Sequence, residues 1–267
     1  MPAAAALGDA PPTASALLSF SGERSVTTSV VLPAFDEENG IAVVLARLRA
    51  VLDVTCEVIV VDDGSHDGTA IAAELAGARV YRHEVNRGKG AAMLTGISGA
   101  RGNKIIFMDA DDTYPVDVIP AIIEALDAVD IVLTSRAHGR ANISPFNRFG
   151  NAVFRRIIAA AAGGPVQDPL SGLYGIHLRH LEAMALSSQR FTVEAEIVIK
   201  ALRMGLTVHQ EPIEYRQRIG ESKLSPVRDG WAIARTSLGV WRSTRKRGWA
   251  PAAGPLVDSS SGLRRVT

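Results

Sequence analysis

The 267-residue sequence contains a single cysteine, Cys56, so no disulfide can form within the chain. Scarcity of cysteine is typical of proteins from a reducing compartment. Cys56 lies in the apolar run "CEVIVV", where a buried structural thiol is a better interpretation than a catalytic one. The sequence therefore excludes an internal disulfide framework and offers little support for thiol catalysis.

The sequence also lacks a strong net charge and any long hydrophobic run. Its 29 Lys and Arg residues nearly balance 28 Asp and Glu residues, for a net charge of +1. General nucleic-acid binders usually carry a strong positive excess, so we expect no nucleic-acid partner. No apolar run approaches the roughly 20 residues that span a bilayer. Residues 1–25 do not resemble a signal peptide and are predicted to form a flexible tail. We expect a cytoplasmic protein that contacts the cytoplasmic face of the membrane peripherally.

Two common nucleotide-binding signatures are absent as well. Neither G-x-G-x-x-G nor G-x-x-x-x-G-K-[ST] occurs, so dinucleotide-binding and P-loop proteins are not indicated. The chain instead has short apolar runs that alternate with helical patterns. Strands are predicted at 28–35, 56–63, 78–83, 104–109 and 130–135, and helices at 41–52, 67–76, 91–100 and 115–126. This alternation predicts a single α/β domain with a mainly parallel sheet flanked by helices.

The second half of the chain has a less regular pattern. Helices are predicted near 147–162, 192–205 and 226–247. The segment "GGPVQDPLSGLYGIH" is predicted to be a loop that leads into a strand, and a strand from 207 runs into a loop that ends near 220. The last helix contains Trp231 and Trp241, is followed by Trp249, and has a basic end. Aromatic bodies with basic tips suit a bilayer interface, although a helix packed on the domain with a solvated end explains them equally well. Residues 250–267 are predicted to form another flexible tail.

Three acidic clusters, "AFDEEN", "DDGSHDGT" and "MDADD", each follow a predicted strand directly. Ligands of parallel sheets lie beyond the carboxyl ends of the strands, so these clusters should converge on one crevice. Asp109 and Asp111 are two positions apart and can face a single Mg²⁺ or Mn²⁺ if the segment is extended. A helix cap would explain one of these carboxylates but not a cluster. Asp62 and Asp63 suit either a base or ribose contact or an Asx turn.

Seven motifs occur in the order seen in family 2 glycosyltransferases of the GT-A fold: "VVLPAFDEEN", "VVDDGSHDGT", "NRGKGAA", "MDADD", "TSR", "DPLSGLYG" and "RIGESKL". The set most resembles dolichol-phosphate (polyprenyl-phosphate) mannose synthases and covers about residues 28–224. The resemblance implies a catalytic domain at 26–224, followed by an amphipathic helix at 225–249. Many relatives continue into membrane-spanning helices at this point, and a membrane-protein partner is left open.

The resemblance implies an inverting, metal-dependent transfer of a hexose to a dolichyl-type polyprenyl phosphate. GDP-mannose is the favoured donor, with UDP-glucose and UDP-N-acetylglucosamine as alternatives. A polyprenyl phosphate is already anionic, so its oxygen can attack without a general base. A family 2 transferase with a soluble or polysaccharide acceptor is a second possibility. A non-catalytic nucleotide-sugar-binding subunit is a third.

The same resemblance assigns roles to individual residues. The nucleotide sugar is expected to contact Pro33, Phe35, Glu37, Val61, Asp63, Asp109, Ala110, Asp111, Arg136, Arg148, Arg218 and Lys223. The expected catalytic set is Asp109, Asp111, Arg136, Arg218 and Lys223. In this set the carboxylates hold the metal diphosphate, and the cations offset the charge of the leaving group and of the acceptor phosphate.

The chain departs from the family pattern next to the Asp-x-Asp pair. Relatives often have a glutamine as a further metal ligand where this chain has Thr113, preceded by Asp112. Either residue could replace that glutamine in the coordination of Mg²⁺ or Mn²⁺. Farther along the chain, Glu194 and Glu196 could face the sugar, and Glu196 aligns with a glutamate of the family. A place on the helix surface or in a core network is an equal alternative for both.

Overall fold

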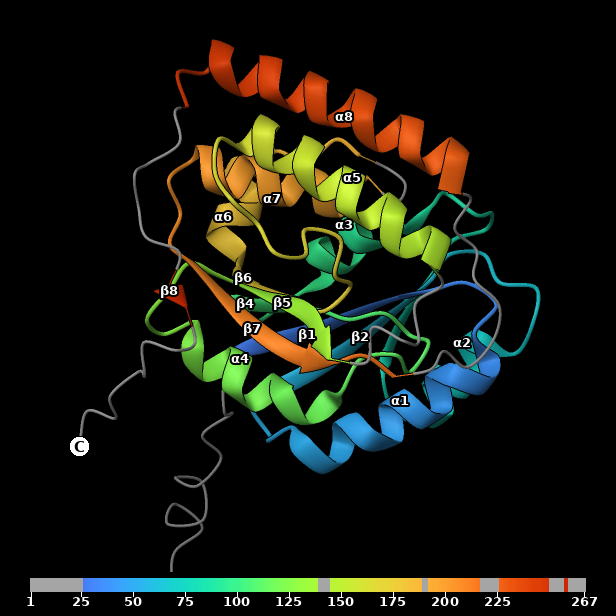
Figure 1. Cartoon of the computed structure of the whole chain (residues 1–267). Helices are drawn as coiled ribbons and strands as arrows, with labels where there is room; N and C mark the ends of the chain where they lie inside the picture. The colour runs from blue at the N-terminus through green and yellow to red at the C-terminus, as the bar shows by residue number, and fades with distance from the viewer. Residues whose placement is uncertain (1–25, 139–144, 189–191, 217–225, 250–256, 259–267) are drawn as a thin grey trace, which may run out of the picture.

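The structure, a computed structural model, describes residues 26–138, 145–188, 192–216, 226–249 and 257–258. Its helices and strands follow one another along the chain as drawn in Figure 1. In order they are β1 (Thr28–Ala34), α1 (Glu38–Val51), β2 (Cys56–Asp62), α2 (Thr69–Leu75), β3 (Arg79–Arg82), α3 (Lys89–Gly99), β4 (Lys104–Phe107), the 3₁₀ helix η2 (Val116–Val118), α4 (Ile119–Ala125), β5 (Ile131–His138), α5 (Pro145–Ala162), β6 (Tyr174–His177), α6 (Leu178–Met184), α7 (Val193–Arg203), β7 (Val208–Glu214), α8 (Pro226–Lys246) and β8 (Val257–Asp258).

Within the described residues, eight strands form one sheet in the order β3-β2-β1-β4-β6-β5-β7-β8. Every neighbouring pair is parallel except those of β6, which runs antiparallel to both β4 and β5. The predicted mainly parallel sheet is therefore confirmed. The register pairs Ala34 of β1 with Asp62 of β2, so the acidic segments that follow these strands leave the sheet side by side.

Helices cover both faces of the sheet (Figure 1). Alternate residues of β1 point to opposite faces, as the strand geometry requires. Val31 joins a core that includes residues of α3, α5, α6 and α7, whereas Val30 and Leu32 join a second core with α1, α2 and α4. The long helix α8 lies outermost, against α5 and α7. Each face of the sheet thus has its own hydrophobic core. The polar clusters lie at the ends of the strands, outside both cores.

A few predicted elements differ from the structure. The helix predicted at 115–126 begins as the short turn η2, and Pro115 precedes it in an extended conformation. Pro120 instead lies in the first turn of α4, where a missing backbone N–H breaks no hydrogen bond of the helix. The sequence analysis missed α6, which follows β6 without a loop. None of the described helices is long and apolar enough to cross a bilayer.

Cys56 is not buried as the sequence suggested, because it stands partly exposed at the first position of β2. Its surroundings nevertheless disfavour the reactive thiolate. Partial burial, followed by the nearby Asp53 carboxylate, raises the pKa of the thiol. This environment is the opposite of the electropositive one that activates catalytic thiols.

Candidate active site

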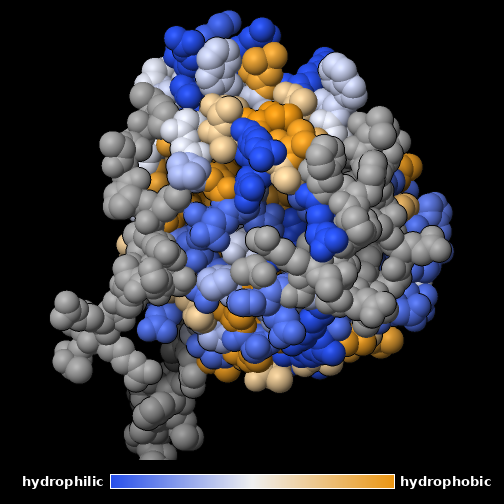
Figure 2. Space-filling view, in the orientation of Figure 1, coloured by the Kyte–Doolittle hydropathy of each residue, from blue (hydrophilic) through white to orange (hydrophobic). Residues whose placement is uncertain are grey.

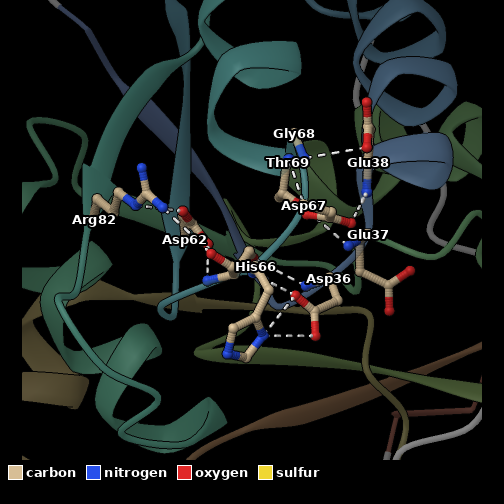
Figure 3. A network of polar contacts seen from close by, with 10 residues as sticks. Asp36, Glu37, Glu38, Asp62, His66, Asp67, Gly68, Thr69 and Arg82 are labelled. Carbon is tan, nitrogen blue, oxygen red and sulfur yellow. Dashed lines mark hydrogen bonds and ion pairs between the residues drawn. The ribbon is translucent and has the colours of Figure 1, made fainter.

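The loops after β1 and β2 are joined by a ladder of hydrogen bonds, which Figure 3 shows. The N–H of Glu37 donates to the Thr69 hydroxyl at 2.8 Å, and the N–H of His66 donates to the Asp36 carboxylate at 2.7 Å. Asp36 adopts a left-handed conformation with φ of 50° at the turn. The Glu37 carboxylate points away from the ladder in Figure 3. Two of the three acidic clusters therefore form one connected rim at the strand ends.

The predicted nucleotide contacts on this rim differ in accessibility. Pro33 and Phe35 are partly exposed at the end of β1, and the Phe35 ring meets the His66 ring edge to face at 5.7 Å. Val61 is completely buried in the core that contains α3. Any contact of Val61 with a nucleotide would therefore have to involve its main chain, because its side chain packs inside the protein.

Asp63 is buried, and its carboxylate serves the fold. It accepts hydrogen bonds from the N–H groups of Arg87 and Gly88 at 2.9 and 2.7 Å. The ring of His83 lies 2.6 Å from the same carboxylate. These contacts hold the loop that leads into α3. The contact of Asp63 with a base or ribose stays a prediction.

The third acidic cluster, which contains Asp109, Asp111 and Asp112, follows β4. Asp111 Oδ1 accepts hydrogen bonds from the N–H and the hydroxyl of Thr113, at 3.1 and 2.6 Å. Burial raises the pKa of the nearby Tyr215, and the negative charges of Asp111 and Asp109 raise it further. Both carboxylates therefore lie near one tyrosine ring. The structure brings the two predicted metal ligands together at the edge where β1, β2 and β4 end.

Two glycines allow other parts of the chain to pack closely against this segment. A Cβ atom on Gly40, in the first turn of α1, would come within 2.8 Å of the Ala110 carbonyl oxygen. A Cβ atom on Gly172 would collide with the Asp109 carboxylate, and the Gly172 N–H donates to the Tyr114 hydroxyl at 2.7 Å. A larger residue at position 40 would press on the main chain of the Asp-x-Asp segment, and a larger residue at position 172 would displace the Asp109 carboxylate.

Lys89 is a site residue that the sequence analysis missed, although it lies in the quoted motif "NRGKGAA". Its Nζ atom lies 2.6 Å from Asp109 Oδ1 and 2.5 Å from Glu194 Oε1. Burial alone would lower the pKa of Lys89, but the two carboxylates outweigh burial and raise it. The lysine is therefore a fixed positive charge between the ends of β4 and α7.

The two candidate replacements for the family's glutamine have different partners. Asp112 forms a two-oxygen ion pair with Arg47 of α1, at 2.5 and 2.7 Å, and has a left-handed φ of 60°. Thr113 instead touches Asp111. No group of three Asp, Glu, His or Cys side chains within the described ranges is arranged to hold a metal alone. The pair Asp109 and Asp111 nonetheless fits Mg²⁺ or Mn²⁺, which take one or two carboxylates together with diphosphate oxygens.

Arg136 lies at the end of β5 but is already paired. Its guanidinium donates two hydrogen bonds to Asp168, at 2.6 and 2.7 Å, and stacks over Tyr215 at 5.4 Å. Burial alone would lower its pKa, but Tyr114 and Asp168 outweigh burial and raise it. The pair anchors the loop that contains "DPLSGLYG", and a direct role of Arg136 at a diphosphate stays a prediction.

The remaining predicted residues are distributed as follows. Arg148 is exposed in the first turn of α5. Arg218 and Lys223 lie outside the described residues, so their predicted roles are untested. Glu196 is fully buried and accepts hydrogen bonds from the Ser188 N–H at 2.7 Å and from Lys200 at 2.5 Å. Of the alternatives for this glutamate, the structure shows the core network.

Comparison with known proteins defines the class. The family model described as glycosyl transferase family 2 matches residues 29–181. The chain therefore belongs to glycosyl transferase family 2, and the predicted family is confirmed. Among solved structures, glucosyl-3-phosphoglycerate synthase from Mycobacterium tuberculosis, in complex with Mn²⁺, UDP and phosphoglyceric acid, matches with a TM-score of 0.65 and 27% identity. That match covers 85% of this chain and 80% of the other, and it confirms the predicted GT-A fold.

Two relatives make the comparison more specific. The chain is 32% identical to a dolichyl-phosphate hexose transferase of Haloferax volcanii, over 82% of this chain and 96% of that protein. It is 31% identical to a dolichol-phosphate mannosyltransferase of Pyrococcus furiosus, over 73% of this chain. The second match covers 58% of the Pyrococcus protein.

Proposed function

We propose that this protein transfers a hexose from a nucleotide sugar to a polyprenyl phosphate. The observation that carries the proposal is the pair Asp109 and Asp111 at the end of β4, beside the rim formed by the loops after β1 and β2. The relative named dolichyl-phosphate hexose transferase supports the lipid acceptor, because this chain matches nearly its whole length.

The residues of the chain suit a single displacement at the anomeric carbon. The acceptor phosphate oxygen forms the new bond as the bond to the diphosphate breaks, which inverts the anomeric configuration. Asp109 and Asp111 would hold Mg²⁺ or Mn²⁺, which would offset the charge of the departing nucleoside diphosphate. Thr113 orients Asp111 by two hydrogen bonds, so this carboxylate needs little reorganisation on binding. Arg218 and Lys223 are proposed to hold the acceptor phosphate.

The donor is proposed to be GDP-mannose, with UDP-glucose as the alternative. One observation favours a second function. The matched Mycobacterium structure is a synthase in complex with UDP and phosphoglyceric acid, a small soluble anion. Thr113, at the position of the family's usual glutamine, is consistent with a donor other than GDP-mannose. A UDP-glucose transferase with a soluble phosphorylated acceptor is therefore the second candidate.

Release of nucleoside diphosphate separates these candidates. The purified chain is incubated with Mn²⁺ and either GDP-mannose or UDP-glucose, with polyprenyl phosphate or phosphoglyceric acid as acceptor. We expect release that requires the polyprenyl phosphate. Release with phosphoglyceric acid alone would favour the second candidate. Donor binding without release under any combination would favour a non-catalytic subunit.

We also propose that α8 rests on the membrane surface that contains the acceptor. Exposed residues recur at helical spacing along α8: Trp231, Arg235, Leu238, Arg242 and Arg245. In Figure 2 hydrophilic and apolar residues alternate along the upper edge of the molecule, where α8 lies in Figure 1. Arginines that flank exposed apolar side chains suit anionic headgroups and the interface beneath them.

Vesicle binding tests this contact. We expect the chain to bind vesicles with phosphatidylserine more tightly than neutral vesicles, with a loss as salt rises. Trp231→Ser together with Arg235→Gln should weaken binding about tenfold, since each basic residue near the surface contributes about 1 kcal/mol. Leu75→Ser is the matched control, because Leu75 is exposed on α2. Equal binding with and without anionic lipid would exclude the contact.

A further inference from the structure

Lys89 lies where three elements of the fold meet. It is the first residue of α3, Asp109 follows β4, and Glu194 is in the first turn of α7. The Nζ atom contacts both carboxylates, at 2.6 and 2.5 Å. The Lys89 side chain is only 15% exposed, that of Glu194 7% and that of Asp109 27%. Asp109 therefore has an ammonium group of the protein as its partner, in a setting where water screens charge poorly.

The surroundings of Glu194 contain unsatisfied polar groups. Glu194 Oε2 and the Tyr174 hydroxyl are both buried with no hydrogen-bond partner among the described residues. Both residues line a cavity of about 10 Å³ together with Ser171 and Asp168. That volume is about the space of one water molecule. Lys89 is the only cationic partner of Glu194 in the described part of the chain.

Lys89 already occupies an oxygen of Asp109, one of the two proposed metal ligands. A metal ion that approaches alone therefore meets a positive charge already in place at that oxygen.

We propose that Lys89 is a built-in cation that competes with the divalent metal for Asp109, so that metal binds well only together with the donor's diphosphate. This inference rests on the proposed function, because it takes Asp109 and Asp111 as the metal ligands. A diphosphate adds oxygen ligands and negative charge, which offset the repulsion between Lys89 and the metal. Glu194 is a positioning residue that keeps Lys89 in the site when the metal takes Asp109.

Binding of Mn²⁺ to the full chain without nucleotide tests the proposal. Titration calorimetry is done with the unmodified chain and with Lys89→Met, which removes the charge but keeps a long side chain. We expect Lys89→Met to bind Mn²⁺ at least about tenfold more tightly, equivalent to about 1.4 kcal/mol. Lys89→Arg keeps the charge and should stay close to the unmodified chain. Glu194→Gln removes one negative charge and should weaken Mn²⁺ binding.

A second lysine on β4 provides the matched control. Lys104 begins this strand, is 13% exposed, and lies 2.6 Å from Asp127 at the end of the strand opposite to Asp109. Lys104→Met removes the same charge from a lysine of similar exposure and should leave Mn²⁺ affinity unchanged. Thermal melting of each variant shows whether it is folded. If Lys89→Met does not fold, the opposite shift expected for Glu194→Gln carries the test.

The outcomes separate this proposal from the proposed function. Equal Mn²⁺ affinity of the unmodified chain and folded Lys89→Met overturns the role of Lys89, even when sugar transfer is observed. An equal gain in Lys104→Met also overturns it, because the effect would then be one of net charge. A gain specific to Lys89→Met, in a chain that transfers no sugar, supports the competing cation and contradicts only the proposed function.

Discussion

The acidic segments after β2 and β4 look alike in the sequence but have different partners in the structure. Asp63, after β2, accepts hydrogen bonds from two backbone N–H groups of the loop before α3. Asp109, after β4, is held by the ammonium group of one lysine side chain. A backbone donor cannot leave without unfolding the loop, whereas a lysine side chain can rotate away. The first carboxylate therefore belongs to the scaffold, and the second is available for exchange with a ligand.

The comparison also explains how a dense acidic cluster is tolerated at the end of β4. Asp112 is neutralised by Arg47, and Asp109 by Lys89. Asp111 accepts two hydrogen bonds from Thr113. Carboxylates this close would otherwise repel one another and take up protons. Each has a different kind of partner, so only part of the charge remains for a metal ion.

The largest effect is expected from substitution of Asp111, in the acidic segment after β4. Asp111→Ala should reduce metal-dependent sugar transfer at least about a thousandfold, since a lost charge stabiliser typically costs two to three orders of magnitude and here a metal ligand is lost as well. The melting temperature should change little. The measurement is nucleoside diphosphate release with Mn²⁺. Asp117→Ala, an exposed carboxylate on η2, serves as control, and near-native turnover of Asp111→Ala would show that the metal assignment is wrong.

Substitution of Asp63, in the acidic segment after β2, should instead lower the stability of the fold. Asp63→Asn replaces an acceptor oxygen with an amide that faces an N–H donor, so it should lower the free energy of unfolding by about 2 kcal/mol. Urea denaturation measures the loss. Asp53→Asn, in an exposed turn, should change stability by less than about 0.5 kcal/mol. Unchanged stability of Asp63→Asn together with a raised KM for the donor would instead favour the predicted nucleotide contact.

The smallest effect is expected at the opposite end of the sheet. Asp130 precedes β5, and despite partial burial its hydrogen bonds from Thr207 and His180 lower its pKa from 3.8 to about 2. A lowered folded-state pKa stabilises the fold above the unfolded value and loses this contribution as the pH falls through the folded value. The contribution, reduced by solvent screening, is about 1 kcal/mol and should disappear as the pH falls from about 4 to 2.

Substitution of Asp130 checks this window. Asp130→Asn should be less stable than the unmodified chain near neutral pH and should show a shallower loss of stability in acid, measured by urea denaturation at each pH. Identical pH profiles for the two proteins would show that Asp130 gains nothing from its partners. A steeper profile for the variant would contradict the lowered pKa of Asp130.

The sequence predicted most of the sheet correctly because buried parallel strands appear in a sequence as short apolar runs. It predicted the strand that became β6 but not its antiparallel direction, since strand direction depends on the path of the preceding loop. It also missed Lys89, because a lysine at the start of a helix usually lies in solvent. It assigned Asp63 to a base or ribose contact and Asp109 to the metal, but it could not show that Asp63 accepts hydrogen bonds from the main chain, because these donors lie in a distant loop.

The sequence by itself determined the α/β class, the family and the edge of the sheet where the acidic clusters gather, because these depend on the order of local patterns. Only the tertiary structure decided which carboxylates keep charge for a ligand. That choice depends on partners from distant parts of the chain: backbone donors for Asp63, Arg47 for Asp112, and Lys89, shared with Glu194, for Asp109. Such partners meet only when α3, β4 and α7 pack together, and no local pattern records their distance.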